Sequence, residues 1–218
     1  MKTALIKKRD HALTLVEVLV VIVVLVVIAA IVLPAFRAAH SPTMPIRCIN
    51  NLKQIGLAYI TWAGDNNDKF PMEISVTNEG TMELAATGNV VATFQIMSNE
   101  LNTPRLLICP EDKGRITANN FAADFNNSRI SYFIGLDAST NFPQAFLSGD
   151  DNFEISGVPV KSGLLELSTN APIAWTTARH NRVGNIGLAD GSVQKLNNPQ
   201  LPLFIQAAGL ATNRLAIP

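Results

Sequence analysis

Few side chains of this sequence are suited to nucleophilic or acid–base chemistry. Its three histidines and two cysteines are His11, His40, His180, Cys48 and Cys109. Only His180 lies beyond the first 40 residues, and Asp190 and Ser192 follow it, so a hydrolase that uses His180 as its base is one interpretation. The sequence around Ser192 lacks a nucleophile elbow or a comparable strained turn. We therefore expect His180 to cap or pack at a strand end, Asp190 to form a turn, and the chain not to be an enzyme.

Metal binding is the second chemistry to consider. Two acidic stretches, GDNND and GDDNFE, contain Asp65, Asp68, Asp150, Asp151 and Glu154. Carboxylates are ligands that Ca²⁺ prefers, but neither stretch follows the spaced pattern of a known calcium loop, so solvated turns are expected. Zinc is disfavoured because Cys48 and Cys109 are far apart in sequence and no paired histidines accompany them. We expect no cofactor, although the sequence leaves calcium binding open.

Composition limits what the rest of the chain can be. The 218 residues are 48% hydrophobic with a formal net charge of +0, which leaves room for one membrane segment and one modest globular domain. The apolar surplus lies in the first 36 residues, whereas residues 66–218 mix polar residues with short apolar runs. Neither a basic nor an acidic excess is present, so no nucleic-acid partner is inferred.

Residues 13–36 form an apolar run in which Glu17 is the only charge. A transmembrane helix needs about 20 such residues, so this run predicts a span. Several basic residues precede it, opposed by Asp10 alone: Lys2, Lys7, Lys8 and Arg9. Basic flanks keep that end in the cytoplasm, which places the rest of the chain on the far side of the inner membrane. A cleaved secretory signal is disfavoured, because its apolar core is only roughly 7–15 residues long.

The start of the run carries a recognisable motif. A basic leader, the small residue Ala12, the segment LTLVEVL and a closing Leu33-Pro34-Ala35 resemble the processing signal of type IV pilins and type II secretion pseudopilins. The resemblance implies that a prepilin peptidase cuts between Ala12 and Leu13 and that the new amino terminus is methylated. The family usually has glycine at the position of Ala12.

Glu17 has two interpretations. A carboxylate at membrane depth costs several kcal/mol unless it is paired or reaches the interface, and Glu17 lies only about 6 Å along the helix from Leu13, so it can simply reach water. The resemblance implies a second role. In pilin-like filaments the matching glutamate attracts the positive amino terminus of a neighbouring subunit, which would make Glu17 an assembly residue.

Beyond the span, the helical spine is expected to be interrupted. Pro34, Pro42 and Pro45 each lack a backbone N–H and predict a helix kink or break. After them, apolar residues recur at spacings of three and four: Ile49, Leu52, Ile55, Tyr59 and Trp62. This periodicity predicts a second helical segment that packs one face on the globular domain and ends near Gly64.

Three further motifs narrow the resemblance to one subgroup of the family. They are CINNLKQIGLAYITWAGDNNDKFP at residues 48–71, LLICPEDK at residues 106–113, and His180 followed after nine residues by Asp190-Gly191. They resemble a large bacterial subgroup of pseudopilin-like proteins, and together they cover both ends and the middle of the chain.

In the globular part, a short helix is predicted at 90–101 and another at 199–210. Strands are predicted at 106–109, 131–136, 145–148, 172–176, 185–189 and 192–196. The last two flank Asp190-Gly191, a dipeptide that favours a type I′ hairpin turn. We thus expect an α+β protein: a leader at 1–12, a transmembrane helix at 13–36, a proline-interrupted spine at 37–65, and an antiparallel-sheet domain at 66–218.

The two cysteines could be bonded to each other. Across the inner membrane a Cys48–Cys109 disulfide can persist, and it would stabilise the fold by about 4 kcal/mol. It would fasten the spine to the first central strand. The alternative is a pair of buried free thiols, and the sequence leaves both open.

These features predict a structural subunit of a type IV pilus-like or type II secretion pseudopilus filament. Its expected partners are prepilin peptidase, an inner-membrane assembly platform, and copies of itself or other pilin-like subunits bound through the amino-terminal helix. We expect a single-pass inner-membrane protein with a cytoplasmic amino terminus, and a filament after assembly. The alternative is a membrane-anchored binding or enzymatic domain that never polymerises. Secretion pseudopilus, surface pilus and uptake fibre stay open, as does a major or minor role.

Overall fold

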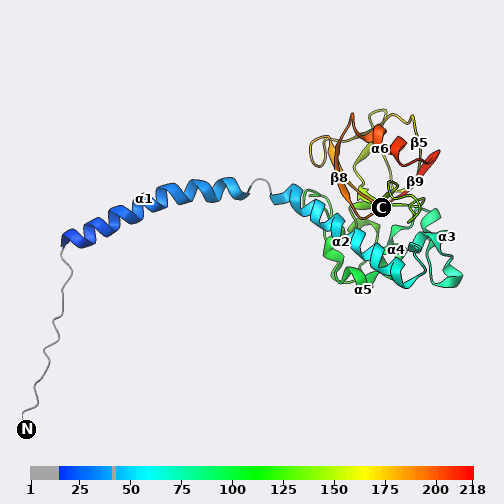
Figure 1. The fold of residues 1–218 in the computed structure, drawn as a ribbon, viewed down its shortest axis with the longest axis horizontal. Helices are drawn as coiled ribbons and strands as arrows, with labels where there is room; N and C mark the ends of the chain where they lie inside the picture. Colours follow the sequence, from blue (N-terminus) through cyan, green and yellow to red (C-terminus); the bar gives the residue numbers. More distant parts are fainter. Residues whose placement is uncertain (1–14, 41–42) are drawn as a thin grey trace, which may run out of the picture. The chain divides into compact units, whose positions relative to one another are not determined.

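The computed structural model of the chain describes residues 15–40 and 43–218 (Figure 1). The predicted leader, the predicted cleavage position between Ala12 and Leu13, and Pro42 lie outside the described residues. The chain divides into two compact units, Met1–Thr43 and Met44–Pro218, and each is described by itself.

The first unit contains a single described helix, α1 (Leu15–His40), with Glu17 in its first turn. Its side chains from residue 15 to residue 31 are exposed. Pro34 does not break the helix, since α1 continues through it to His40. A proline inside a helix removes one backbone hydrogen bond and favours a kink, so a long helix can continue past it.

Among the described residues, no helix combines the length and the apolar character that a membrane crossing requires.

The second helix, α2 (Thr43–Asp65), has Pro45 in its first turn. Pro45 therefore does not break a helix, because the first backbone N–H groups of a helix have no partner within the helix. The predicted apolar face is confirmed: Leu52, Ile55 and Tyr59 are buried, together with Trp62. From Met44 onward this helix belongs to the second compact unit.

Short helical segments follow α2. They are η1 (Pro71–Glu73), η2 (Val76–Asn78), α3 (Met82–Ala86), α4 (Val90–Ile96), α5 (Ser98–Leu101), η3 (Pro104–Leu107) and η4 (Asn127–Arg129). The helix predicted at 90–101 is present as α4 and α5, which meet at Met97. The strand predicted at 106–109 is wrong. The Thr103 side chain accepts a hydrogen bond from the Arg105 N–H and Pro104 follows it, so the chain starts η3 there.

The strands form two antiparallel sheets. The larger has the order β5-β9-β1-β2-β7-β8 and the smaller β4-β3-β6. Their bounds are β1 (Tyr132–Gly135), β2 (Phe146–Asp150), β3 (Phe153–Ile155), β4 (Val158–Pro159), β5 (Gly163–Ser168), β6 (Ile173–Trp175), β7 (Val183–Leu188), β8 (Val193–Asn197) and β9 (Thr212–Ile217). A short helix, α6 (Leu201–Ala207), precedes β9. The predicted α+β class is confirmed.

The large sheet separates two hydrophobic cores. Tyr132 and Ile134 of β1 belong to the core that includes α2, whereas Phe133 between them belongs to the core that includes β3, β6 and α6. Successive strand residues point to opposite faces, so both faces of this sheet are covered. In Figure 1, α2 to α5 gather at one end of the unit, and β5, β8, β9 and α6 gather at the other.

The predicted hairpin joins β7 and β8, but its turn is not type I′. The Gly191 N–H donates to the Leu188 carbonyl (2.9 Å), and the Leu188 N–H donates to the Ser192 carbonyl (2.9 Å). Gly191 has φ +82°, whereas Asp190 is not among the residues with positive φ. A type I′ turn needs positive φ at both central residues, so this is a three-residue loop that ends in a left-handed glycine.

Candidate functional site

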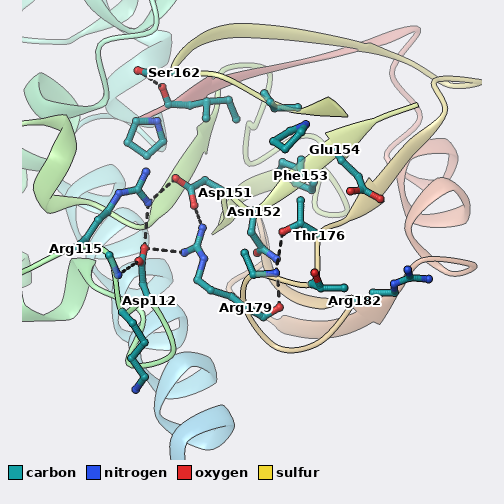
Figure 2. A pocket seen from close by; sticks show the side chains of 18 residues that line it. Asp112, Arg115, Asp151, Asn152, Phe153, Glu154, Ser162, Thr176, Arg179 and Arg182 are labelled. Atoms are coloured by element: carbon teal, nitrogen blue, oxygen red, sulfur yellow. Dashed lines mark hydrogen bonds and ion pairs between the residues drawn. The ribbon is translucent and has the colours of Figure 1, made fainter. Parts of the chain in front are cut away.

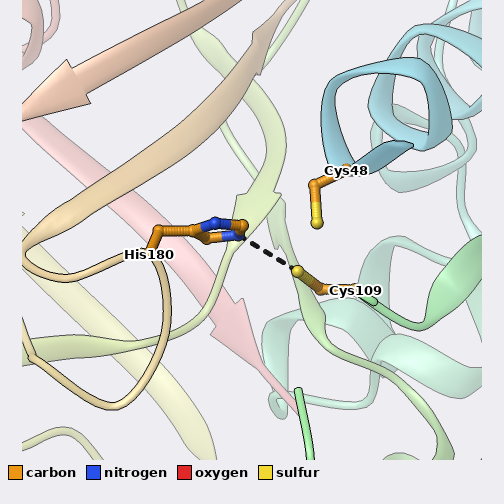
Figure 3. A group of neighbouring side chains, drawn as sticks. All are labelled: Cys48, Cys109 and His180. Carbon is orange, nitrogen blue, oxygen red and sulfur yellow. Dashed lines mark hydrogen bonds between the residues drawn. The ribbon is translucent and has the colours of Figure 1, made fainter. Parts of the chain in front are cut away.

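Cys48, Cys109 and His180 converge inside the second unit. Cys48 lies on α2, Cys109 follows η3, and His180 lies in the turn before β7 (Figure 3). Their sulfur and nitrogen atoms all lie within 4.8 Å of one another. The Cys109 Sγ is 3.1 Å from the His180 Nε2, both cysteines are fully buried, and the His180 side chain is 3% exposed. We call these three residues the Cys–His cluster.

The CPED sequence orients Cys109 through a tight turn. The Asp112 N–H donates to the Cys109 carbonyl (2.8 Å), which places Pro110 at the second turn position that proline favours. The Asn51 side chain on α2 donates to the carbonyl of Ile108 (3.1 Å), directly before Cys109. The cysteine is thereby held against the helix that carries Cys48.

His180 is held in a strained backbone conformation. His180, Asn181 and Arg182 have φ of 51°, 51° and 63° in succession, a left-handed region that residues other than glycine rarely occupy. Each such residue costs about 1–3 kcal/mol. The Arg182 N–H donates to the Thr176 carbonyl (3.2 Å), which closes the turn. Strain of this kind concentrates at functional sites, so the position of His180 is unlike that of an ordinary turn residue.

Asp150 borders the Cys–His cluster from β2. It lies opposite Tyr132 in the β1–β2 pair, and opposite residues project to the same face, which here is the core that contains both cysteines. Its Oδ2 accepts from the backbone N–H (2.8 Å) and the side chain (2.9 Å) of Asn185 and lies 3.6 Å from the His180 Nε2. Its Oδ1 is buried and has no hydrogen-bond partner among the described residues.

The electrostatics of the cluster oppose a reactive cysteine. The neighbouring Cys48 thiol and burial raise the pKa of Cys109 far above its usual value. Burial lowers the pKa of His180, but Cys109 and the Asp150 carboxylate outweigh it and the net pKa is raised. A nucleophilic cysteine needs a lowered pKa and some exposure, and Cys109 has neither.

The geometry also differs from a catalytic triad. Cys109 and Asp150 both approach Nε2 of the same imidazole, whereas a triad places nucleophile and carboxylate on opposite ring nitrogens. The hydrolase interpretation is not supported either. His180 contacts Cys109 and Asp150, while the Asp190 Oδ1 accepts the Ser192 N–H (2.8 Å) at the hairpin turn.

The two cysteines are free in the structure. Of the two states left open by the sequence, the structure therefore has the pair of buried thiols. Cys109 does not lie in a strand as expected, because η3 replaces that strand.

Beside the cluster lies a network of ion pairs that we call the Arg–Asp network (Figure 2). Arg179 pairs with Asp151, and its Nη1 lies 3.3 Å from the Asp112 Oδ2. Arg115 pairs with Asp151 (2.7 Å) and with Asp112 (3.2 Å). Burial raises the pKa of Asp112, but Arg179, a hydrogen bond from Ser131 (2.9 Å) and Arg115 outweigh it and the net pKa is lowered.

The acidic stretch GDDNFE is thus not a solvated turn. Asp150 and Asp151 are buried, Asp150 beside the cluster and Asp151 in the Arg–Asp network. Asp65 and Asp68 of GDNND are exposed, as expected for a solvated turn.

The Arg–Asp network borders a cavity of about 740 Å³. Asn152, Glu154, Thr176 and Arg182 also line it, as Figure 2 shows, and His180 does not. The cavity and the Cys–His cluster are therefore separate features, linked through the adjacent residues Arg179 and His180.

The Asp190-Gly191 turn reaches α2 at a different place. A Cβ on Gly191 would lie 2.8 Å from the Cδ1 of Ile60, and a Cβ on Gly56 would lie 3.5 Å from the Cα of Gly191. The hairpin tip therefore packs on α2, and glycine is favoured at residue 191 by its positive φ.

The structure brings three of the sequence-selected residues together and leaves two apart. Cys48, Cys109 and His180 form the cluster, whereas Asp190 and Gly191 lie at the hairpin turn. Sequence reasoning missed Asp150 and Arg179. The available signals were their positions in the sequence. Arg179 directly precedes His180, and Asp150 lies in the acidic stretch that was considered for calcium.

Comparison with known proteins bears on the amino-terminal segment. Residues 7–33 match the family model described as the prokaryotic N-terminal methylation motif. No curated protein and no solved structure matches the chain. The chain therefore carries a type IV pilin-like prepilin signal, as its sequence predicts, and such a signal implies processing by a prepilin peptidase. The match does not extend to the carboxy-terminal motif.

Proposed function

We propose that this chain is a structural subunit of a type IV pilus-like or type II secretion pseudopilus filament, and not an enzyme. The observation that carries the proposal is the prepilin signal at residues 7–33, which overlaps the helix α1. A processing signal of this kind followed by a separate compact unit is the organisation of a filament subunit.

The apolar surface of α1 supports an assembly role. Its side chains from residue 15 to residue 31 are exposed, and large Leu, Val and Ile residues lie all along it. A helix that is apolar on all sides needs lipid or other helices around it. The apolar run of the sequence, residues 13–36, extends beyond the described side chains of α1. We propose that this run crosses the inner membrane before assembly and packs against the same segment of other subunits in the filament.

Glu17 gives this packing a register. It lies in the first turn of α1, and in the sequence it stands four residues beyond Leu13, whose amino group the cleavage would free. In an apolar surrounding, a carboxylate attracts a positive amino terminus strongly. We propose that Glu17 draws the new amino terminus of an incoming subunit to its place, with the assembly platform in the inner membrane as a further partner.

A second candidate function is a membrane-anchored binding domain that does not polymerise. The cavity beside the Arg–Asp network favours it, because charged and polar residues line a space large enough for a small ligand. In this alternative, residues 13–36 serve only as an anchor.

The two candidates differ in their response to prepilin peptidase. We expect the chain to enter a sheared filament fraction only when the peptidase is active, and to stay in the inner membrane when it is absent. A chain that stays in the inner membrane under both conditions would support the anchored binding domain instead.

A further inference from the structure

The Cys–His cluster has the donor atoms of a metal site. Two sulfurs and one imidazole nitrogen lie within 4.8 Å of one another and come from three segments far apart in sequence. In a tetrahedral zinc site, bonds of about 2.0–2.3 Å place ligand atoms about 3.3–3.8 Å apart. The 3.1 Å between the Cys109 Sγ and the His180 Nε2 and the 3.6 Å between the Asp150 Oδ2 and that nitrogen are close to such spacings.

Asp150 supplies an independent indication of a cation. It is fully buried, its side chain projects into the core that holds both cysteines, and its Oδ1 has no hydrogen-bond partner among the described residues. A buried carboxylate is costly unless a positive charge or hydrogen bonds compensate it. The Asn185 hydrogen bonds compensate only Oδ2, and the nearby arginine, Arg179, is engaged by Asp151 and Asp112.

We propose that Cys48, Cys109, His180 and Asp150 together bind a zinc ion. All four positions around the metal would be filled by protein atoms, which is the arrangement of a structural site and not of a catalytic one. The ion would join α2, the turn after η3, the end of β2 and the strained turn before β7. This proposal is independent of the filament role, and it departs from the expectation that the chain has no cofactor.

The donor set selects the class of metal. Thiolate and imidazole favour Zn²⁺ over the hard cations Ca²⁺ and Mg²⁺. Binding would replace the thiol protons of Cys48 and Cys109 with metal–sulfur bonds and release both protons to solvent, and the neutral imidazole would bind through Nε2. The Asn185 hydrogen bonds would hold the Asp150 carboxylate in place, a supporting contact that metal ligands commonly have.

Local structure holds the proposed ligands in position for metal binding. Asn51 and the CPED turn hold Cys109 against α2, and the left-handed run at 180–182 turns the imidazole toward the sulfurs. Metal binding would give the strain at His180 a function, because the strained turn holds the imidazole ring at the position where it can bind the metal.

The test uses the full chain, purified in detergent under reducing conditions. We expect about one tightly bound zinc ion per chain by elemental analysis, as four filled protein positions imply. Replacement with Co²⁺ should give the intense visible absorption of a tetrahedral site and a near-ultraviolet thiolate-to-cobalt band. Cys109→Ser and His180→Gln should each weaken zinc affinity at least tenfold, and Asp150→Asn should weaken it less. Asp190→Asn, a carboxylate change at the exposed hairpin turn, is the matched control and should bind as wild type.

Several results would overturn the proposal. They are a folded, reduced chain that binds no zinc, a cobalt spectrum without the thiolate band, or copper(I) binding in place of zinc. A native chain isolated with a Cys48–Cys109 disulfide and no metal would do the same. If the variants do not fold, the wild-type cobalt spectrum still decides whether thiolates bind the metal.

Discussion

In two pairs of adjacent residues, one side chain lies at the Cys–His cluster and the other lies in the Arg–Asp network. Asp150 contacts His180 and Asp151 enters the Arg–Asp network, while Arg179 enters that network and His180 joins the cluster. A backbone shift at either pair would disturb both sites at once. His180 is therefore constrained by the strained turn, by the cluster and by its neighbour Arg179.

Processing belongs to the residue scale, since it depends on Ala12 and Leu13. Mass spectrometry of the membrane-extracted protein should find an amino terminus at Leu13, methylated. Ala12→Gly should be cleaved at least as well, because glycine is usual at that position of the signal. A chain that keeps residues 1–12 in cells with active peptidase would contradict this prediction.

The hairpin glycine allows a second prediction. Gly191→Val should lower the free energy of unfolding by about 2–3 kcal/mol, because a β-branched residue must adopt positive φ and its Cβ meets Ile60. Asp190→Asn should change it by less than about 0.5 kcal/mol, since the amide oxygen can still accept the Ser192 N–H. Thermal melting of residues 44–218 measures both variants. Equal losses in the two variants would show that Asp190 has a role beyond the turn.

At the scale of elements, hydrophobic periodicity and turn residues predicted the elements whose formation depends on local sequence. The apolar face of α2 and strands β1, β2, β6, β7 and β8 follow from periodicity and turn residues, and the structure confirms them. Strands β3, β4, β5 and β9 were missed. Strands β5 and β9 depend on a distant partner, as when Leu164 and Leu165 of β5 pair with Ala216 and Leu215 of β9. Strands β3 and β4 form a local hairpin through Ser156-Gly157, a turn signal that the sequence reasoning overlooked.

The cluster shows the same limit for a site. Cys48, Cys109 and His180 could be selected one by one from residue type and motif. Their convergence could not be predicted, because it depends on a tight turn, a left-handed run and the packing of α2, which act between segments far apart in sequence. Zinc was disfavoured on sequence spacing alone, which describes only sites built within one or two local segments.

The Arg–Asp network predicts a pH dependence. The pKa of Asp112 is lower in the folded chain than in the unfolded chain, so the stability it contributes is present above about pH 4 and is lost as the pH falls through the folded pKa. Asp112→Asn should lower the free energy of unfolding by about 2–3 kcal/mol at neutral pH, because two arginines lose a partner. The variant should also lose less stability than wild type when the pH falls from about 5 to about 3.

Urea unfolding of residues 44–218 at several pH values measures this dependence. Asp65→Asn, at an exposed carboxylate, is the control and should follow wild type. An acid-induced loss of stability as large in Asp112→Asn as in wild type would show that the network does not depend on this carboxylate.

At the scale of the whole molecule, the two units have different tasks in the proposed filament. The exposed apolar helix α1 would serve insertion and assembly, while the second unit has its own two cores and carries the cluster and the cavity. Changes at Glu17 should therefore affect assembly without affecting the melting of the second unit in the full chain.

The most direct measurement compares wild type, Glu17→Gln and Glu17→Leu by membrane fractionation and by recovery of sheared or crosslinked multimers. Both variants should be inserted and cleaved as well as wild type, since removing a charge from an apolar segment favours the bilayer. Filament recovery should fall about tenfold or more, because the incoming amino terminus loses an attraction of about 1.5–3 kcal/mol. Filaments of either variant at the wild-type level would contradict the assembly role of Glu17, and loss of the variants from the membrane would contradict the argument from depth.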